Sequence, residues 1–300
     1  DRLGLDYDSV RAINPSIVYT VISGFGAKGP RSADPAYDGA VQAAAGMMAN
    51  NGTAESGPLR TGYMPVDLMT GMTAAYATTA ALLRKQKTGE GQMVDVAMLD
   101  CAITLGSANF SRSEVDDIPD MLIGNQSITS APTASSFPTA EGSILTAAIM
   151  PNHVEAFFDE IGLKEMLSDP KFATREARIE NKEIVRDAMI EALKSDTAEN
   201  WEKRLAPRGV PVAKINSVKE TARLEQLQYR NILTAVPAAK GMATGYKLPG
   251  APFTNSEDGP EVMRPAPVLG QHTLEILEEI GIEKSIISTL AAEGVICKDD

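Results

Sequence analysis

The chain has 300 residues, 43% of them hydrophobic and 23% charged, and a formal net charge of −12. This balance is typical of a globular protein, and it argues against nucleic acid as a general partner, because phosphate contacts need clustered Lys and Arg. No apolar run reaches the ~18 residues of a membrane span, and Cys101, Cys297 and two histidines are too few for a disulfide framework or a His-rich metal site. We therefore expect a cytoplasmic protein with no membrane or nucleic-acid partner and no metal.

The first 110 residues predict alternating strands and helices. Residues 4–13 read as a short helix, and the β-branched run at 17–22 predicts a buried strand that enters a Gly-rich loop. A short strand is expected at 94–96, after a helix that ends at Thr88-Gly89-Glu90-Gly91. The expected helices of this part are 37–49, 68–87 and 98–110. The alternation predicts a doubly wound, Rossmann-like α/β sheet.

The pattern changes after Ser111, where residues 113–136 read as loop. A strand at 143–149 and another at 211–215 flank three amphipathic helices, at 152–161, 176–194 and 197–206. We expect 113–215 to form a smaller α+β domain with its linkers. From Ser217 onward the sequence predicts a helix, strands in a Gly/Pro-rich stretch, and terminal helices at 273–280 and 283–293.

Asp67 lies where a loop rich in Gly and Pro meets the long helix at 68–87. Asp is a favoured N-cap, whose side chain accepts a hydrogen bond from a backbone N–H. A carboxylate kept ionised at a helix start is equally suited to attack an acyl group. Spacing alone leaves the capping role and the nucleophilic role open.

Three glycines, Gly24, Gly26 and Gly29, follow the first predicted strand. The dinucleotide-binding fingerprint has a similar spacing but opens directly into a helix. Here Pro30 and Pro35 keep the chain in a loop. A ligand-binding loop and a turn with close backbone approach both fit this segment.

Several motifs recur in a fixed order along the whole chain. They are Ser23-Gly24-Phe25-Gly26, Gly29-Pro30, Tyr37-Asp38, Asp67-x-x-x-Gly71, Thr88-Gly89-x-Gly91-Gln92-x-Val94-Asp95-Val96, Gly124-Asn125, Gly209-Val210-Pro211, Ala251-Pro252-Phe253 and Ala266-Pro267-x-Leu269-Gly270-x-His272-Thr273. Together they resemble the family III CoA-transferases, which include formyl-CoA transferase, carnitine CoA-transferase and alpha-methylacyl-CoA racemase. The resemblance covers essentially all 300 residues.

The resemblance implies a Rossmann-like large domain, a smaller α+β domain and a C-terminal segment that returns to the large domain. On this chain they fall at 1–112, 113–215 and 216–300, and two chains are expected to interlock as a homodimer. Family members usually begin about a hundred residues earlier, so the resemblance also implies that this chain lacks an N-terminal segment.

The resemblance assigns roles to individual residues. Asp67 falls on the catalytic aspartate, which carries first the acyl group and then CoA, so that CoA and acyl-CoA act as cosubstrates and no cofactor is permanently bound. Gly124, Asn125 and Gln126 fall near a mobile loop that covers the substrate. The positions that fall on CoA contacts are Arg2, Asp34, Pro35, Ala36, Tyr37, Asp38 and Met98.

Two departures from the family bear on function. Pro35 stands where some members have a basic residue that contacts CoA, and the glycine run of the formyl-CoA transferase loop is absent, which weakens a prediction of formyl or oxalate substrates. Racemases of the family use a His where this chain has Tyr37, and a phenol is a poor base at neutral pH. We therefore expect a CoA-transferase that acts on an acyl-CoA and a small carboxylic acid. The alternatives are an acyl-CoA racemase and a non-catalytic acyl-CoA-binding subunit.

Overall fold

The computed structural model describes residues 3–239, 241–259 and 264–296. The chain divides into two compact units, Asp1–Lys214 and Ile215–Asp300. Within the first unit, the buried apolar residues fall into separate clusters, one set at 41–102 and another at 137–210. We call the parts of the chain around these clusters the Asp67 region, from α1 to α5 (residues 7–116), and the helical region, from β5 to β7 (residues 136–214). The boundary expected between 112 and 113 stays a prediction.

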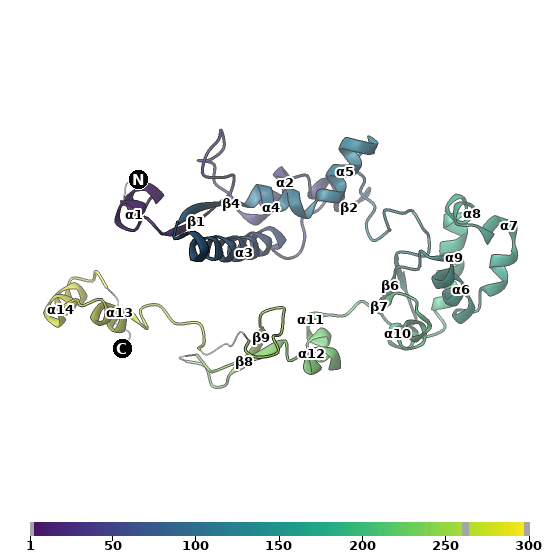
Figure 1. Cartoon of the computed structure of the whole chain (residues 1–300). Helices are drawn as coiled ribbons and strands as arrows, with labels where there is room; N and C mark the ends of the chain where they lie inside the picture. The colour runs from purple at the N-terminus through teal and green to yellow at the C-terminus, as the bar shows by residue number, and fades with distance from the viewer. Residues whose placement is uncertain (1–2, 240, 260–263, 297–300) are drawn as a thin grey trace. The chain divides into compact units, whose positions relative to one another are not determined.

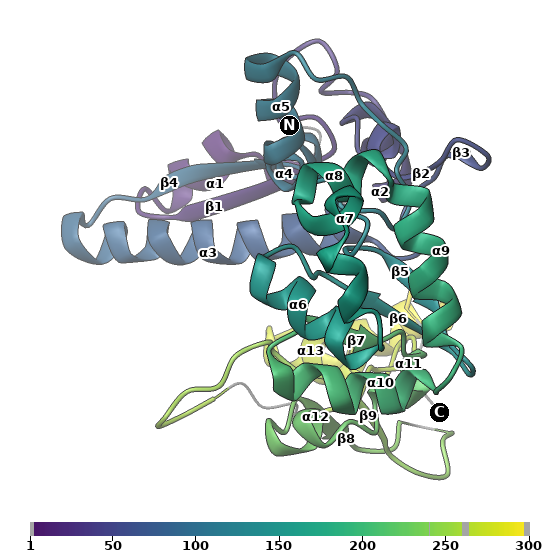
Figure 2. The same cartoon turned by 90° about the vertical axis from the view of Figure 1, so that its right-hand side faces the viewer.

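The Asp67 region is built on a parallel pair of strands, β1 (Val18–Ser23) and β4 (Gln92–Ala97). Their register runs from Val18 opposite Gln92 to Ser23 opposite Ala97. Helix α3 (Pro65–Thr88) connects to β4 and lies along the pair (Figures 1 and 2). Parallel strands joined through a helix are what the alternating sequence pattern predicts, so the α/β class is confirmed.

Helices α2 (Asp38–Ala44) and α4 (Met98–Leu105) pack with the first turn of α3 around Val41, Val66 and Ala102. The remaining elements of this region are α1 (Tyr7–Ile13), the 3₁₀ turn η1 (Met48–Asn50), the hairpin strands β2 (Gly52–Thr53) and β3 (Gly57–Pro58), and α5 (Ser107–Asp116). The predicted helix at 98–110 is thus two helices, because Gly106 interrupts it.

The helical region surrounds a three-stranded antiparallel sheet in the order β5 (Ser136–Pro138), β6 (Ser143–Thr146), β7 (Val212–Lys214). Its core holds large side chains such as Phe157 and Trp201, and the Trp201 Nε1–H donates to the Leu193 carbonyl over 2.9 Å. Its helices are α6 (Pro151–Glu160), η2 (Lys164–Ser168), α7 (Pro170–Ala173), α8 (Arg175–Glu180), α9 (Lys182–Leu193), α10 (Ala198–Leu205) and η3 (Ala206–Arg208).

The predicted helix at 176–194 is wrong as a single element, because it divides into α8 and α9 at Asn181. The Asn181 side chain donates from Nδ2 to the carbonyls of Ala177 (2.9 Å) and Lys171 (3.2 Å). Asn competes for backbone groups in this way and so favours helix ends.

The second unit holds α11 (Val218–Thr221), α12 (Glu225–Tyr229), the antiparallel strands β8 (Leu233–Val236) and β9 (Tyr246–Pro249), α13 (Thr273–Glu279) and α14 (Lys284–Ala292). Among its described residues, the buried apolar side chains are Val236 and Ile287. The two terminal helices confirm the sequence prediction.

Candidate active site

Asp67 is the third residue of α3, after Pro65 and Val66. Pro suits the first helical position because its missing N–H needs no partner there. Val66 is fully buried and Thr70, one turn on, is 3% exposed, so this face of the helix is fixed in the core. Asp67 lies off that face and is exposed.

The helix start is capped by Asp38, from the first turn of α2. Asp38 is 7% exposed, and its Oδ2 accepts the backbone N–H groups of Val66 (2.9 Å) and Asp67 (3.1 Å). The N-cap residue of α3 itself, Met64, makes no side-chain capping bond. The structure therefore decides against the capping role that the sequence left open for Asp67, whose carboxylate receives no hydrogen bond from any described residue.

Gln42 completes the support for this helix start. It is 1% exposed, and its Nε2 donates to Asp38 Oδ1 (2.6 Å) and Thr61 Oγ1 (2.9 Å), while its Oε1 accepts the Thr61 N–H (3.1 Å). Thr61 in turn donates from Oγ1 to the Tyr63 carbonyl (2.8 Å). Buried groups that are all paired hold a single geometry, so α2 fixes the loop that leads into Asp67.

A hollow with a volume of about 270 Å³ opens in front of Asp67. Tyr37 and Tyr63 are 84% and 62% exposed and offer apolar ring surface beside the carboxylate. The hollow is lined by Tyr37, Asp38, Gly39, Arg60, Thr61, Gly62, Tyr63, Met64 and Asp67. The structure thus brings together three residues that the sequence singled out, Tyr37, Asp38 and Asp67.

Gly24 explains how the loop after β1 reaches this site. A Cβ at this position would lie 2.2 Å from the Ala36 Cβ, which is too close for two carbon atoms that are not bonded to each other. The Gly24 carbonyl also accepts the Leu99 N–H at the start of α4 (3.0 Å). The structure therefore favours the second of the two interpretations of the glycine motif, a turn with close backbone approach. Gly24 lets the segment that carries Tyr37 and Asp38 pack against the sheet.

Of the other residues expected to contact CoA, those that the structure describes do not line the hollow. Asp34 is paired with Arg31 (Nε to Oδ2, 2.8 Å), Pro35 is exposed, and Met98 packs against the core at the start of α4. Arg2 lies outside the described residues. These CoA contacts stay predictions.

Gly124, Asn125 and Gln126 also lie outside this lining. The Gly124 N–H donates to the Gly52 carbonyl (2.7 Å), and Asn125 Nδ2 donates to Ser136 Oγ (3.0 Å). This segment is thereby tied to the β2–β3 hairpin and to β5. Its expected role near the substrate stays a prediction.

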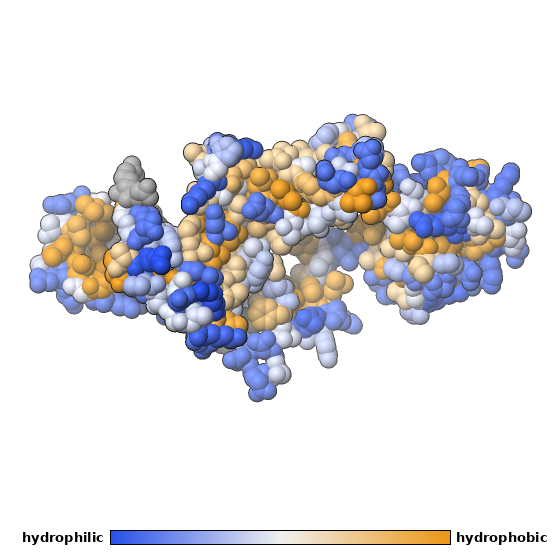
Figure 3. Space-filling model, turned by 45° about the horizontal axis from the view of Figure 1, so that its top comes forward, coloured by the Kyte–Doolittle hydropathy of each residue, from blue (hydrophilic) through white to orange (hydrophobic). Residues whose placement is uncertain are grey.

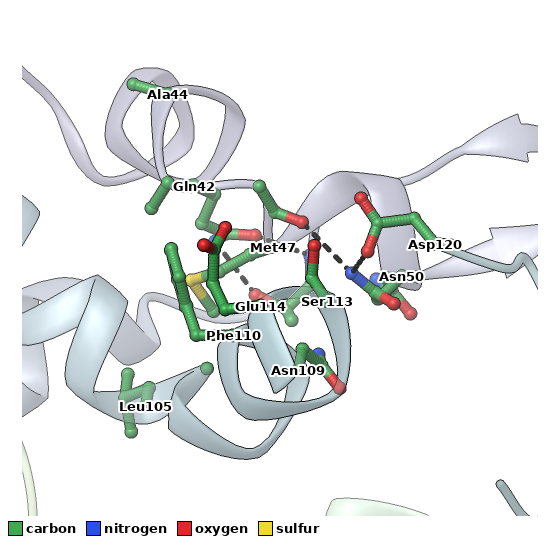
Figure 4. A pocket seen from close by; sticks show the side chains of 15 residues that line it. Gln42, Ala44, Met47, Asn50, Leu105, Asn109, Phe110, Ser113, Glu114 and Asp120 are labelled. Atoms are coloured by element: carbon green, nitrogen blue, oxygen red, sulfur yellow. Dashed lines mark hydrogen bonds between the residues drawn. The ribbon is translucent and has the colours of Figure 1, made fainter. Parts of the chain in front are cut away.

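A second cavity, of about 420 Å³, lies between α2, η1 and α5. Figure 4 shows side chains of α5 reaching toward Gln42, and the Asn50 Nδ2 donates to Asp120 Oδ1 over 2.7 Å. Thr61 lines both this cavity and the Asp67 hollow. Its titratable lining residues, Glu114 and Asp120, are both acidic and would repel an anionic ligand such as CoA.

Arg60, Gln42 and Tyr63 are site residues that the sequence did not single out. Gln42 follows Asp38 by four residues and so shares its helix face, which is a usable signal. Arg60 is a cation seven residues before Asp67 in an acidic chain, but only the fold places it in the hollow.

Neither a metal site nor a membrane span is found in the described part of the chain. No group of three or more His, Cys, Asp or Glu side chains there is placed to bind a metal ion. Its helices are too short or too polar to cross a bilayer.

Comparison with known proteins identifies relatives over almost the whole chain. The model of CoA-transferase family III matches residues 1–273. An acyl-CoA transferase of Fusarium pseudograminearum is 30% identical over 299 residues, which cover 99% of this chain and 65% of the relative. A succinate–glutarate CoA-transferase of Agrobacterium fabrum is 30% identical over 287 residues, which cover 93% of this chain and 69% of the relative.

A solved structure is similar as well. The crystal structure of a CaiB/BaiF family protein from Brucella suis superimposes with a TM-score of 0.80 at 26% identity, over 93% of this chain and 72% of that one. The chain therefore spans about two thirds of the length of the curated relatives it matches.

Proposed function

Because the chain belongs to CoA-transferase family III, we propose that it moves CoA from an acyl-CoA thioester to a free carboxylic acid, with Asp67 as the nucleophile. The observation that carries this proposal is the exposed Asp67 carboxylate, which faces a hollow and receives no hydrogen bond from a described side chain. Attack on a thioester needs such an unengaged anion.

In the first half of the proposed reaction, a carboxylate oxygen of Asp67 attacks the thioester carbonyl of the donor. The C–S bond breaks, leaving a mixed anhydride on Asp67 and a CoA thiolate. The thiolate then attacks the aspartyl carbonyl of the anhydride, which releases the donor acid as a carboxylate and leaves Asp67 as a thioester of CoA. Covalent catalysis thus divides one difficult exchange into easier steps.

The second half reverses these steps with a new acid. The acceptor carboxylate attacks the aspartyl thioester, forms a second anhydride and expels the thiolate. The thiolate attacks the acceptor's carbonyl carbon, so a new acyl-CoA leaves and the Asp67 carboxylate is restored. No net charge or proton is consumed, because one carboxylate and one thioester are exchanged for another pair.

Asp38 acts as a positioning residue in this proposal. Because its Oδ2 occupies the N–H groups of Val66 and Asp67, it fixes the direction of the helix that carries the nucleophile. Those two N–H groups are then unavailable to a developing oxyanion, which needs other donors.

We further propose that CoA contacts the residues assigned from the family resemblance, and that the active form is an interlocked homodimer. Tyr37 supports the first part, because its exposed ring lines the same hollow as Asp67 and can contact the pantetheine arm. Similarity to the succinate–glutarate CoA-transferase of Agrobacterium fabrum makes succinyl-CoA the first donor to test.

The test is an exchange assay of succinyl-CoA and acetyl-CoA against a panel of free acids, with Asp67→Ala and Asp67→Asn beside the unchanged chain. We expect exchange in the unchanged chain and its loss in both variants. Hydroxylamine added after acyl-CoA should leave a hydroxamate at Asp67, which peptide mass spectrometry detects. Full exchange by Asp67→Ala would contradict the mechanism.

The same samples separate the alternatives. A racemase would incorporate deuterium at the alpha carbon of the acyl group without acyl exchange. A non-catalytic binding subunit would retain acyl-CoA but show neither exchange nor a hydroxamate.

A further inference from the structure

The hollow in front of Asp67 contains two carboxylates and one cation. Asp38 is fully engaged, since one of its oxygens accepts two backbone N–H groups and the other accepts from Gln42. Asp67 is committed to the reaction in the proposed function. Among the described residues that line the hollow, Arg60 is the one Lys, Arg or His.

Arg60 is exposed and lies beside Gly39, in the first turn of α2. A Cβ on Gly39 would lie 3.8 Å from both the Cδ and the Nη1 of Arg60, so the side chain runs past the first turn of α2 in van der Waals contact range. Its guanidinium makes no ion pair within 4.0 Å with Asp67, although both residues line the hollow. The guanidinium and the Asp67 carboxylate are therefore more than 4.0 Å apart.

A guanidinium binds a carboxylate through two parallel N–H···O bonds, a geometry that a lysine ammonium does not reproduce. An acid with two carboxyl groups can react at Asp67 through one of them and meet Arg60 with the other. Without a cation in the hollow, the carboxylates of Asp67 and Asp38 would repel such a dianion. A monocarboxylic acid of the same length has no group for Arg60 to bind.

We propose that Arg60 binds the non-reacting carboxylate of a dicarboxylic acid substrate and so selects dicarboxylic over monocarboxylic acids. This inference rests on the proposed function, because it takes Asp67 as the reacting group. Arg60 is a specificity-determining residue here and takes no part in the acyl-transfer steps.

The test compares Arg60→Gln and Arg60→Lys with the unchanged chain, using glutarate and the monocarboxylic acid valerate as acceptors. We expect Arg60→Gln to lower kcat/KM for glutarate by about 10- to 100-fold, chiefly through KM, as for loss of a charged hydrogen-bond partner. Its effect on valerate should stay within about threefold. Arg60→Lys should show a preference for glutarate between those of Arg60→Gln and the unchanged chain, because it keeps the positive charge but loses the two parallel N–H donors of the guanidinium.

The matched control is Lys87→Gln, which removes one positive charge from the far end of α3, and it should leave both acids unaffected. Equal losses for glutarate and valerate in Arg60→Gln would mean that Arg60 binds CoA or supports the loop, and would overturn the proposal. Unchanged kinetics would overturn it too.

A binding measurement distinguishes failure of this inference from failure of the proposed function. Saturation-transfer NMR should detect glutarate on the unchanged chain and on Asp67→Asn, and a much weaker signal on Arg60→Gln. One outcome would refute the Arg60 proposal and leave the proposed function standing. It is a hydroxamate at Asp67 with equal glutarate signals on the unchanged chain and on Arg60→Gln. Arg60-dependent glutarate binding without any hydroxamate would leave Arg60 as the anion site and refute the transferase mechanism.

Discussion

The helical region and the Asp67 region hold their structures by different means. The helical region buries a cluster of fifteen apolar residues that includes four phenylalanines and the chain's one tryptophan. The Asp67 region buries two small clusters, of four and three residues, in which no side chain is larger than valine. On α3, Leu68, Met72 and Tyr76 are 60–64% exposed. Figure 3 shows the same contrast, with broad orange surface over the Asp67 region and mostly blue surface over the helical region.

The contrast indicates where each kind of interaction is used. Large apolar side chains supply most of the stability of the helical region, because burial of each contributes on the order of 2 kcal/mol. The Asp67 region relies on a buried polar network, Asp38–Gln42–Thr61, which adds less stability but specifies one geometry. In the proposed function Asp67 is the nucleophile, and a nucleophile that must meet a substrate atom needs that geometric definition.

The largest effect is expected from Phe157→Ala in the helical region. Phe157 is fully buried, and its removal should lower the free energy of unfolding by about 3–5 kcal/mol through lost burial and a cavity. Urea unfolding followed by the fluorescence of Trp201, in the same core, measures it. Leu82→Ala on α3, at a residue 51% exposed, is the control and should change the free energy by under about 0.5 kcal/mol. Equal losses would contradict the contrast between the regions.

An intermediate effect is expected from Asp38→Ala. Loss of the capping carboxylate should cost about 1–2 kcal/mol locally, and the amides of Val66 and Asp67 should exchange with deuterium faster. Asp38→Asn keeps an acceptor oxygen, so its stability and its amide exchange rates should fall between those of the unchanged chain and Asp38→Ala. Unchanged exchange in Asp38→Ala would show that the network does not hold the helix start in solution.

The smallest effect concerns pH. A side-chain hydrogen bond from Arg208 lowers the pKa of Glu160, and likewise the pKa of Asp159, below their ordinary values. A lowered pKa in the folded state adds stability above the ordinary carboxyl pKa, and that stability is lost as pH falls through the lowered value. We therefore expect the free energy of unfolding to fall on acidification, and Arg208→Gln to reduce that fall.

Lys203→Gln is the control for this pH dependence. Lys203 pairs with Glu199 in a contact where both side chains are at least 60% exposed, and exposed pairs contribute little. Its slope of stability against pH should match that of the unchanged chain. If Arg208→Gln and the unchanged chain show the same slope of unfolding free energy against pH, the ion pairs of Arg208 are not the source of the pH dependence.

The sequence predicts the features that depend on neighbouring residues. The end of α3 follows from Gly89, which takes a left-handed φ of 76°, and the strand at 18–23 follows from its β-branched run. The sequence singles out Asp67 as a carboxylate at a helix start, but spacing leaves its role open and the family resemblance alone assigns it to catalysis. The bonds from Asp38 to the N–H groups of Val66 and Asp67 are not predictable, because they span 28 and 29 residues of chain that no local pattern encodes. The same reason applies to Arg60.

The burial of Val66 and Thr70 has a consequence for how the length of this chain can vary. Each residue turns an α-helix by about 100°, so a one-residue insertion inside the first turn of α3 would turn the Asp67 carboxyl away from its hollow or move a polar group into the core. In the hairpin between β2 and β3, Thr53 is bridged to Ile123 and hydrogen-bonded to Ser56, but Ala54 and Glu55 at its tip are exposed and pack in no core. Length changes are therefore tolerable at that tip and not at the helix entrance, which makes the tip the place to graft a tag or a reporter without disturbing the chemistry.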